Sequence, residues 1–216
     1  MIKYDLLVIG FGKAGKTLAA TLGNEGKKVA VVEESSEMYG GTCINIGCIP
    51  TKTLIVAADN KKEFKEAKAT RDTVVSKLNA KNFAMLDNNP NIDVYTASAK
   101  FVSNKVVEIS IDGETKQLEG DIVVINTGAK NNVLPIPGLT TSKNVYDSTQ
   151  FQKLEVAPKT LGIIGGGNIG IEFANLYARF GVDVTVIDFA PTVLGREDKD
   201  IAEMAKGYLE EAGVTF

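Results

Sequence analysis

Continuously apolar runs, separated by glycine turns and amphipathic segments, mark the beginning of the chain. Leu6 to Ile9 is apolar at every position and precedes a glycine turn, as expected for a strand buried on both faces of a parallel sheet. Residues 13–25 predict a helix that ends at Gly26, and residues 29–32 predict the next parallel strand. The pattern therefore predicts a βαβ unit.

A similar unit recurs far downstream. The pattern predicts a strand at 161–164, a turn at 165–170, a helix that runs to Phe180 and a second strand at 183–187. We therefore expect an α/β fold with two Rossmann-like dinucleotide-binding units, each built as three layers around a mostly parallel sheet.

The region between the two units has a different pattern. Residues 52–86 read as mostly helical, and the segment from Asn88 to Asn91 breaks that helix. Short alternating segments then span residues 92–119, and Asp112-Gly113 between two of them is a strong hairpin signal. We expect a small antiparallel β-meander over about 92–119, followed by a buried strand at 121–126.

Each βαβ unit carries a Gly-x-Gly-x-x-Gly motif after its first strand and an acid after its second. The acids are Glu33 and Asp188, each 18 positions beyond the third glycine of its motif (15 to 33, and 170 to 188). Such glycines permit a tight turn and close approach of a pyrophosphate to a helix N-terminus, and the acid binds a ribose diol. The alternative is a loop with helix-packing glycines. The motif glycines are Gly10, Gly12, Gly15, Gly165, Gly167 and Gly170.

Composition and charge exclude several classes of partner. The net charge is −3, and no basic cluster interleaved with aromatic residues is present, so we expect no nucleic-acid partner. The chain begins directly with a predicted strand, and we expect no apolar run of membrane-spanning length and no membrane partner. The cytoplasm is the expected location.

Two cysteines, Cys43 and Cys48, follow the first βαβ unit with four residues between them. In a cytosolic chain such cysteines are more often catalytic or metal-binding than structural. The chain contains no histidine, which rules out a histidine metal site or a Cys/His nucleophile within it and leaves a tetrahedral zinc site short of ligands. Spacing alone leaves a redox pair and two buried structural thiols both open.

Residues 40–52, GGTCINIGCIPTK, resemble the active-site segment of class I pyridine nucleotide-disulfide oxidoreductases, the family of glutathione reductase, lipoamide dehydrogenase and mercuric reductase. The segments 125–129 and 165–172 also resemble that family, so the resemblance covers the whole chain. Segments 10–18, 38–41 and 145–149 are most similar to its bacterial reactive-chlorine-resistance flavoproteins, some of which are labelled mercuric reductases.

The resemblance implies FAD at the first glycine motif and NAD(P)H at the second. It implies that residues 1–150 are the FAD-binding domain and 151–216 part of the NAD(P)-binding domain. Cys48 would be the thiolate against the flavin, and Cys43 the interchange thiol of a redox-active disulfide. Lys52 would lie near the flavin and pair with Glu172 at the nicotinamide site. The further FAD contacts implied are Gly41, Thr42, Ala99, Thr127 and Gly128.

The activity implied is electron transfer from NAD(P)H through FAD and the disulfide to a small oxidised substrate. Reactive chlorine or thiocyanate species and metal ions are the substrate classes implied. Asp188 favours NADH, because an acid hydrogen-bonds a ribose 2′-hydroxyl but repels a 2′-phosphate.

Family members continue for about this length again, so the resemblance implies an incomplete second unit. The C-terminal FAD segment and the dimerisation domain, with the histidine that activates the interchange thiol across a homodimer, would be absent. Two alternatives to an oxidoreductase follow. The chain could be a catalytically inactive FAD- or nucleotide-binding module, or its cysteines could serve as a redox sensor.

Overall fold

The computed structural model describes residues 1–216, and the chain divides into two compact units. Unit 1 comprises Met1–Pro50 and Thr73–Ile136, and unit 2 comprises Thr51–Asp72 and Pro137–Phe216. The elements of unit 1, with the helices that continue into unit 2, are β1 (Ile2–Ile9), α1 (Lys13–Asn24), β2 (Val29–Glu33), η1 (Ser36–Met38), α2 (Gly41–Asn45), α3 (Cys48–Asp59), α4 (Phe64–Asp87), β3 (Ile92–Thr96), β4 (Ala99–Ser103), β5 (Val106–Ile111) and β6 (Glu114–Ile125). The remaining elements of unit 2 are α5 (Ser148–Phe151), β7 (Thr160–Ile164), α6 (Asn168–Arg179), β8 (Asp183–Ile187) and α7 (Lys199–Glu211).

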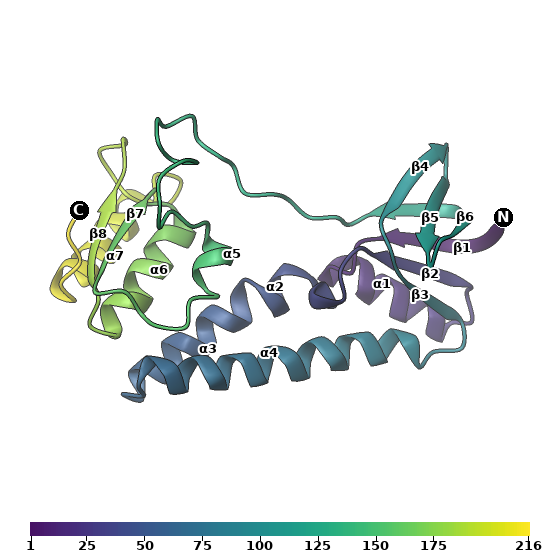
Figure 1. Ribbon diagram of the computed structural model, residues 1–216, viewed down its shortest axis with the longest axis horizontal. Coiled ribbons are helices and arrows are strands. Elements are labelled where there is room, and N and C mark those ends of the chain that lie inside the picture. The colour runs from purple at the N-terminus through teal and green to yellow at the C-terminus, as the bar shows by residue number, and fades with distance from the viewer. The chain divides into compact units, whose positions relative to one another are not determined.

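Unit 1 is built on a six-stranded sheet in the order β3-β2-β1-β6-β5-β4 (Figure 1). Strands β1, β2 and β3 are parallel, and Leu6 to Ile9 pair with Val29 to Val32 as the sequence pattern predicts. One face of this parallel part is covered by α1 and the end of α4. Its core consists of Leu6, Val8, Phe11, Ala19, Val29, Val31, Tyr39, Leu86 and Ile92.

The opposite face of the same strands packs against residues of β5 and β6. Val107, Ile109 and Leu118 share a core with Leu7 and Val32, so the antiparallel strands fold over the parallel ones. Asp112 and Gly113 both have positive φ, at 53° and 83°, which gives the tight two-residue turn expected of that dipeptide.

The predicted meander at 92–119 is wrong in two respects. Strand β3 pairs in parallel with β2, because it follows the crossover helix α4 and adds to the sheet edge as a βαβ connection. The segments expected as two strands, at 117–118 and 121–126, form the single strand β6, which pairs antiparallel with β5 and then parallel with β1. The antiparallel part is therefore β4-β5-β6.

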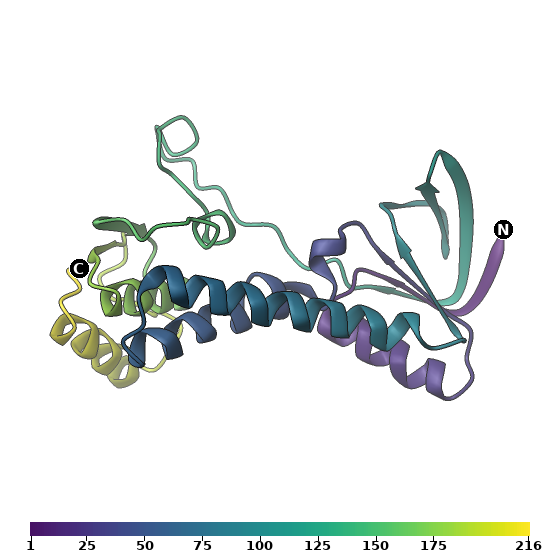
Figure 2. The same cartoon turned by 60° about the horizontal axis from the view of Figure 1, so that its bottom comes forward.

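Unit 2 contains the second βαβ unit. The two strands expected at 161–164 and 183–187 are present as β7 and β8, which pair in parallel, and α6 connects them. Tyr177 and Leu176 of α6 are buried with Val184 of β8 and with Leu54 and Ala67 of the α3–α4 segment. The second view shows α6 and α7 among the elements of this unit (Figure 2).

One stretch of helix is unusually apolar. Residues Gly41–Asp59 span 19 residues with a mean hydropathy of 1.3, which is enough by length and composition to cross a membrane. The expectation that no apolar run approaches that length is therefore wrong. Ile46 and Gly47 separate α2 from α3 within the stretch, and core helices of globular proteins meet the same criterion, so it is weak evidence for a membrane.

Candidate dinucleotide and dithiol sites

The first glycine turn joins β1 to α1, and Gly12 is the N-cap of the helix without any side chain to cap it. The first backbone N–H groups of α1 are therefore free to bind an anion. Gly10 adopts φ +99°, which disfavours any side chain. A methyl group on Gly12 or Gly15 would lie 2.7 Å from the side-chain nitrogen of Asn126. Close packing beneath the turn therefore requires glycine at these positions.

Asn126 is a residue that the sequence reasoning did not assign to the site. Its amide donates to the carbonyl of Gly10 at 3.3 Å, and its backbone N–H donates to the carbonyl of Ile9 at 2.7 Å. The side chain thus supports the glycine turn from the end of β6. Its place directly after an apolar run, within the segment 125–129 that resembles the family, was the available signal.

Glu33 ends β2 with its carboxylate directed at this turn. One oxygen accepts the N–H of Phe11 at 2.8 Å and the other accepts the N–H of Ser35 at 3.1 Å. The backbone carbonyl of Glu33 accepts the N–H of Ala97 at 2.8 Å, so the segment leading into Ala99 lies beside the acid. Glu33 is buried, which fixes the carboxylate in place at the end of the sheet.

The second glycine turn repeats this arrangement in unit 2. Gly167 is the uncapped N-cap of α6, Gly165 has φ +109°, and a methyl group on Gly170 would collide with the carbonyl of Gly165. By contrast, a methyl group on Gly167 would meet no atom within 4 Å. The helix N-terminus is therefore open toward a ligand.

Asp188 takes the same position as Glu33. Its carboxylate accepts the N–H of Gly166 at 2.6 Å and that of Ala190 at 2.8 Å. These backbone donors, Ala190 first and then Gly166, hold the pKa of Asp188 below its usual range. Each acid therefore accepts one backbone N–H from the residue 22 positions before it and one from the residue two positions after it.

The two turns fit dinucleotides. Each combines glycines that a side chain would disrupt, a helix N-terminus without a cap, and an acid fixed at the end of the following strand. Phosphates are stabilised at such N-termini, and the acid is placed to bind a ribose hydroxyl.

Cys43 lies in α2 and Cys48 begins α3, and both are free thiols in the structure. The thiols are in hydrogen-bond contact. That contact with Cys48, followed by burial, raises the pKa of Cys43, while the charges of Lys13 and Lys16 act in the opposite direction. A helix N-terminus near a cysteine favours its thiolate form. For Cys43 the contact with the second sulfur outweighs it.

The short helix α2 is fixed against the first glycine turn. Gly40 and Gly41 have φ +97° and +74°, and a methyl group on Gly41 would lie 2.7 Å from the Cα of Gly12. The buried Asn45 donates to the carbonyls of Tyr39 and Gly41 at 3.0 and 2.9 Å, and accepts from Asn79 at 3.0 Å. These contacts bring the Cys43 segment to the beginning of α1.

Lys52 and Glu172 form an ion pair within unit 2, as the resemblance implied. Lys52 lies in α3 and Glu172 in the first turns of α6, close in sequence to the glycines at 165–170. Their catalytic role stays a prediction.

The other predicted contacts lie at the same end of the unit 1 strands. Thr42 is exposed in the first turn of α2, Ala99 begins β4 and is half-buried, and Thr127 and Gly128 are exposed directly after β6.

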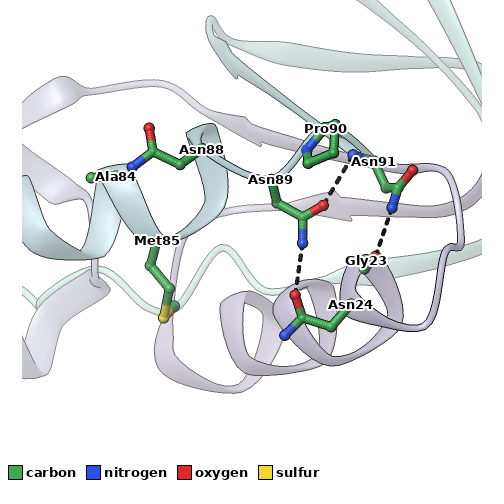
Figure 3. Close-up of a pocket in the computed structure, with 8 residues that line it drawn as sticks. All are labelled: Gly23, Asn24, Ala84, Met85, Asn88, Asn89, Pro90 and Asn91. Atoms are coloured by element: carbon green, nitrogen blue, oxygen red, sulfur yellow. Dashed lines mark hydrogen bonds between the residues drawn. The ribbon is translucent and has the colours of Figure 1, made fainter.

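A surface hollow lies elsewhere in unit 1. It encloses about 530 Å³ at the C-terminal ends of α1 and α4, whereas the glycine turn is at the N-terminal end of α1. Figure 3 shows its asparagines bonded mainly to each other and to backbone: Asn89 donates to Asn24 at 2.8 Å, and Asn91 donates to the carbonyl of Gly23 at 3.0 Å. Because the side-chain amides of Asn89 and Asn91 already have partners, these residues link α1 to the segment that follows α4.

Comparison with known proteins places the whole chain in one family. The family described as pyridine nucleotide-disulphide oxidoreductase matches residues 4–216. The chain belongs to this family. It is 48% identical over 214 residues to the probable pyridine nucleotide-disulfide oxidoreductase RclA of Escherichia coli K12, covering 99% of this chain and 48% of that protein. It is 34% identical over 231 residues to the dihydrolipoyl dehydrogenase of Thermus scotoductus, covering 99% of this chain and 48% of that protein.

Solved structures agree with the sequence relationship. The Cu(II) complex of HOCl-induced flavoprotein disulfide reductase RclA from Escherichia coli matches with a TM-score of 0.95 and 48% identity, over 100% of this chain and 49% of that one. The same reductase without copper in its description matches with a TM-score of 0.92 over 98% of this chain. The α/β Rossmann-like fold is thus confirmed. The chain spans about half the length of the relatives it matches.

Proposed function

We propose that this chain carries the dinucleotide sites and the redox-active dithiol of an FAD-dependent NAD(P)H oxidoreductase that reduces a small oxidised molecule. The observation that carries the proposal is the contact between the Cys43 and Cys48 thiols on a segment packed against the first glycine turn through Gly41 and Gly12. This contact holds two sulfurs within reach of one disulfide, next to a turn that fits a dinucleotide.

The two glycine turns receive different cofactors in this proposal. Residues 1–150 hold FAD, through Gly10, Gly12, Gly15 and Glu33, with further contacts from Gly41, Thr42, Ala99, Thr127 and Gly128. Residues 151–216 hold NAD(P)H through Gly165, Gly167, Gly170 and Asp188. When bound, the two cofactors supply a pair of electrons that neither the chain nor its thiols can generate.

The chain's own residues hold and position the reacting groups. Cys48 receives the electrons and Cys43 attacks the substrate, so that one turnover oxidises the dithiol to a disulfide and passes two electrons to the acceptor. Lys52 and Glu172 orient the nicotinamide, supported by their ion pair in α3 and α6. The hydrogen bond between the thiols keeps the dithiol compact between turnovers.

Asp188 supports a preference for NADH. Its carboxylate is fixed by two backbone donors and its lowered pKa keeps it charged, so it binds a 2′-hydroxyl and repels a 2′-phosphate. In full-length protein, Asp188→Ser is expected to raise the kcat/KM for NADPH relative to NADH by roughly tenfold or more. An unchanged ratio would remove Asp188 as the determinant.

The substrate class is proposed from the relatives. Reactive chlorine or thiocyanate species are favoured because the E. coli relative is described as an HOCl-induced reductase, and metal ions because it is described in a Cu(II) complex. A cytoplasmic homodimer with no nucleic-acid or membrane partner completes the proposal for the full-length protein.

The deciding experiment measures free thiols and NADH consumption in the same sample. The oxidised protein, supplied with FAD and NADH without an acceptor, is expected to gain two free thiols per chain for each NADH consumed. A Cys43→Ser variant is expected to gain none. NADH oxidation that continues at the same rate in Cys43→Ser would take the disulfide off the catalytic route and favour a redox sensor. A protein that binds FAD but neither oxidises NADH nor gains thiols would act as a nucleotide-binding module.

A further inference from the structure

Two lysines stand at the point where α1 begins. Lys13 and Lys16 are three residues apart in the first turn, so their side chains share one face of the helix. The Cys43 segment meets the same end of α1, because Gly41 packs on Gly12 directly before Lys13. Lys13 is exposed and Lys16 is half-buried, and the positive charges of both act on the Cys43 thiol.

The charges that act on the Cys43 thiol are unbalanced. The cations acting on Cys43 are Lys13 and Lys16, and the other group acting on it is the Cys48 thiol. Burial, and then the like charge of Lys13, lowers the pKa of Lys16, while Cys43 raises it. Neither lysine forms an ion pair with a carboxylate of the chain. Two cations therefore face the thiol without an internal counter-ion.

We propose that Lys13 and Lys16 are specificity-determining residues that draw small anions to Cys43, so that the substrate class of this thiol is a small anionic electrophile. This rests on the proposed function in making Cys43 the thiol that meets the substrate. The physical basis is that two unpaired positive charges raise the local concentration of anions, with little effect on neutral molecules of the same size.

The test compares two alkylating agents that differ in charge. Iodoacetate is an anion and iodoacetamide is neutral, and both react with the same thiolate, so the ratio of their rates at Cys43 reports the charge seen by the reagent. The reduced chain is treated at low ionic strength and pH 8, and fragmentation mass spectrometry separates Cys43 adducts from Cys48 adducts. The variants are K13Q, K16Q, the double variant, and K27Q as a control that removes one positive charge from an exposed lysine beyond the other end of α1.

The double variant is expected to lower the iodoacetate-to-iodoacetamide ratio by about threefold to tenfold, and K27Q to leave it unchanged. Adding 0.5 M salt is expected to bring the wild-type ratio close to that of the double variant, since screening acts on reagent charge. Folding of each variant is checked by the iodoacetamide rate at Cys48 and by circular dichroism.

Four results would overturn the proposal. The iodoacetate-to-iodoacetamide ratio could stay the same in the double variant, or K27Q could lower that ratio equally. Both reagents could also react more slowly by the same factor, which would show that the lysines act on the thiolate and not on the incoming molecule. If the difference in ratio between the wild type and the double variant disappears when FAD is bound, the two lysines bind the dinucleotide phosphates, and the proposal is also overturned. Because alkylation needs no NADH, a failure of turnover and a failure of anion selection are observed separately.

Discussion

Gly41 and Gly12 are packed so closely that a methyl group on Gly41 would lie 2.7 Å from the Cα of Gly12. Gly41 also has φ +74°, a conformation that side chains disfavour. We expect Gly41→Ala to lower the free energy of unfolding by about 2–4 kcal/mol, from strain and steric overlap together, and to separate the Cys43 segment from the glycine turn. Urea unfolding measures the first effect, and FAD fluorescence quenching measures the second.

Gly113→Ala is the matched control for Gly41→Ala. Gly113 has φ +83°, but a methyl group there would meet no atom within 4 Å. Its substitution carries the backbone strain without the overlap, at a cost of about 1 kcal/mol. Equal losses in the two variants would show that the packing of Gly41 on Gly12 contributes nothing.

Asn45 secures the helix that carries Cys43. Its buried amide donates to two backbone carbonyls and its oxygen accepts from Asn79, so Asn45→Ala removes three hydrogen bonds. We expect a loss of about 2–3 kcal/mol in urea unfolding and faster alkylation of Cys43. Asn60→Ala, which removes one exposed bond to the carbonyl of Val56, should cost under about 1 kcal/mol. Similar losses in both would contradict the role assigned to Asn45.

The sequence predicts the regular parts of this fold because their signals are local. Apolar runs of four or five residues and glycine spacing locate β1, β2, β7 and β8, and the acid after each second strand is found with its backbone partners. The course of β3 depends on a partner strand 63 residues earlier, which no local pattern contains, so its parallel pairing was missed. A helix between two strands was the signal that could have corrected it.

The residues of the candidate site also divide into those that local sequence motifs predict and those that they do not. The glycines, acids and cysteines lie within contiguous motifs and were predicted, whereas Asn126 reaches the glycine turn from 116 positions away. The raised pKa of Cys43 also escaped prediction, because it depends on a thiol contact and on burial and not on helix position alone. Contacts between distant segments, and the balance of opposing charges, require coordinates.

Asp188 is expected to make stability depend on pH. Because backbone donors lower its pKa in the fold, its carboxylate stabilises the protein above the pKa of the unfolded chain, and that contribution is lost as pH falls through the folded value. Asp188→Asn should therefore reduce the loss of stability between about pH 5 and pH 3. Asp183→Asn, at the first residue of the strand that Asp188 follows, is the control. Identical pH profiles for all three proteins in urea unfolding would contradict this prediction.

The Lys52–Glu172 ion pair is expected to matter for chemistry more than for folding. The side chains are 63% and 29% exposed, so solvent screens the pair, and a double-mutant cycle with Lys52→Gln and Glu172→Gln should give a coupling under about 1 kcal/mol. The exposed pair Lys62–Glu66 should give a similar value. In full-length protein, Lys52→Gln should slow NADH-dependent thiol formation by roughly tenfold or more. A large coupling with unchanged thiol formation would make the pair structural.

Replacing Cys48 is expected to make Cys43 more reactive. The hydrogen bond that the Cys43 thiol donates to Cys48 is the largest cause of the raised pKa of Cys43, so Cys48→Ala should lower that pKa and increase the thiolate fraction at pH 8. We expect iodoacetamide to alkylate Cys43 about threefold faster, with the rate profile shifted to lower pH. Cys48→Ser keeps a hydroxyl partner and should shift the profile less. A thiol whose pKa is raised in the fold stabilises the protein fully below its unfolded pKa, and this contribution is lost as pH rises through the folded pKa. The reduced wild type should therefore also lose stability above about pH 9, and Cys48→Ala should lose less. A slower or unchanged reaction in Cys48→Ala would show that burial, and not the second sulfur, controls Cys43.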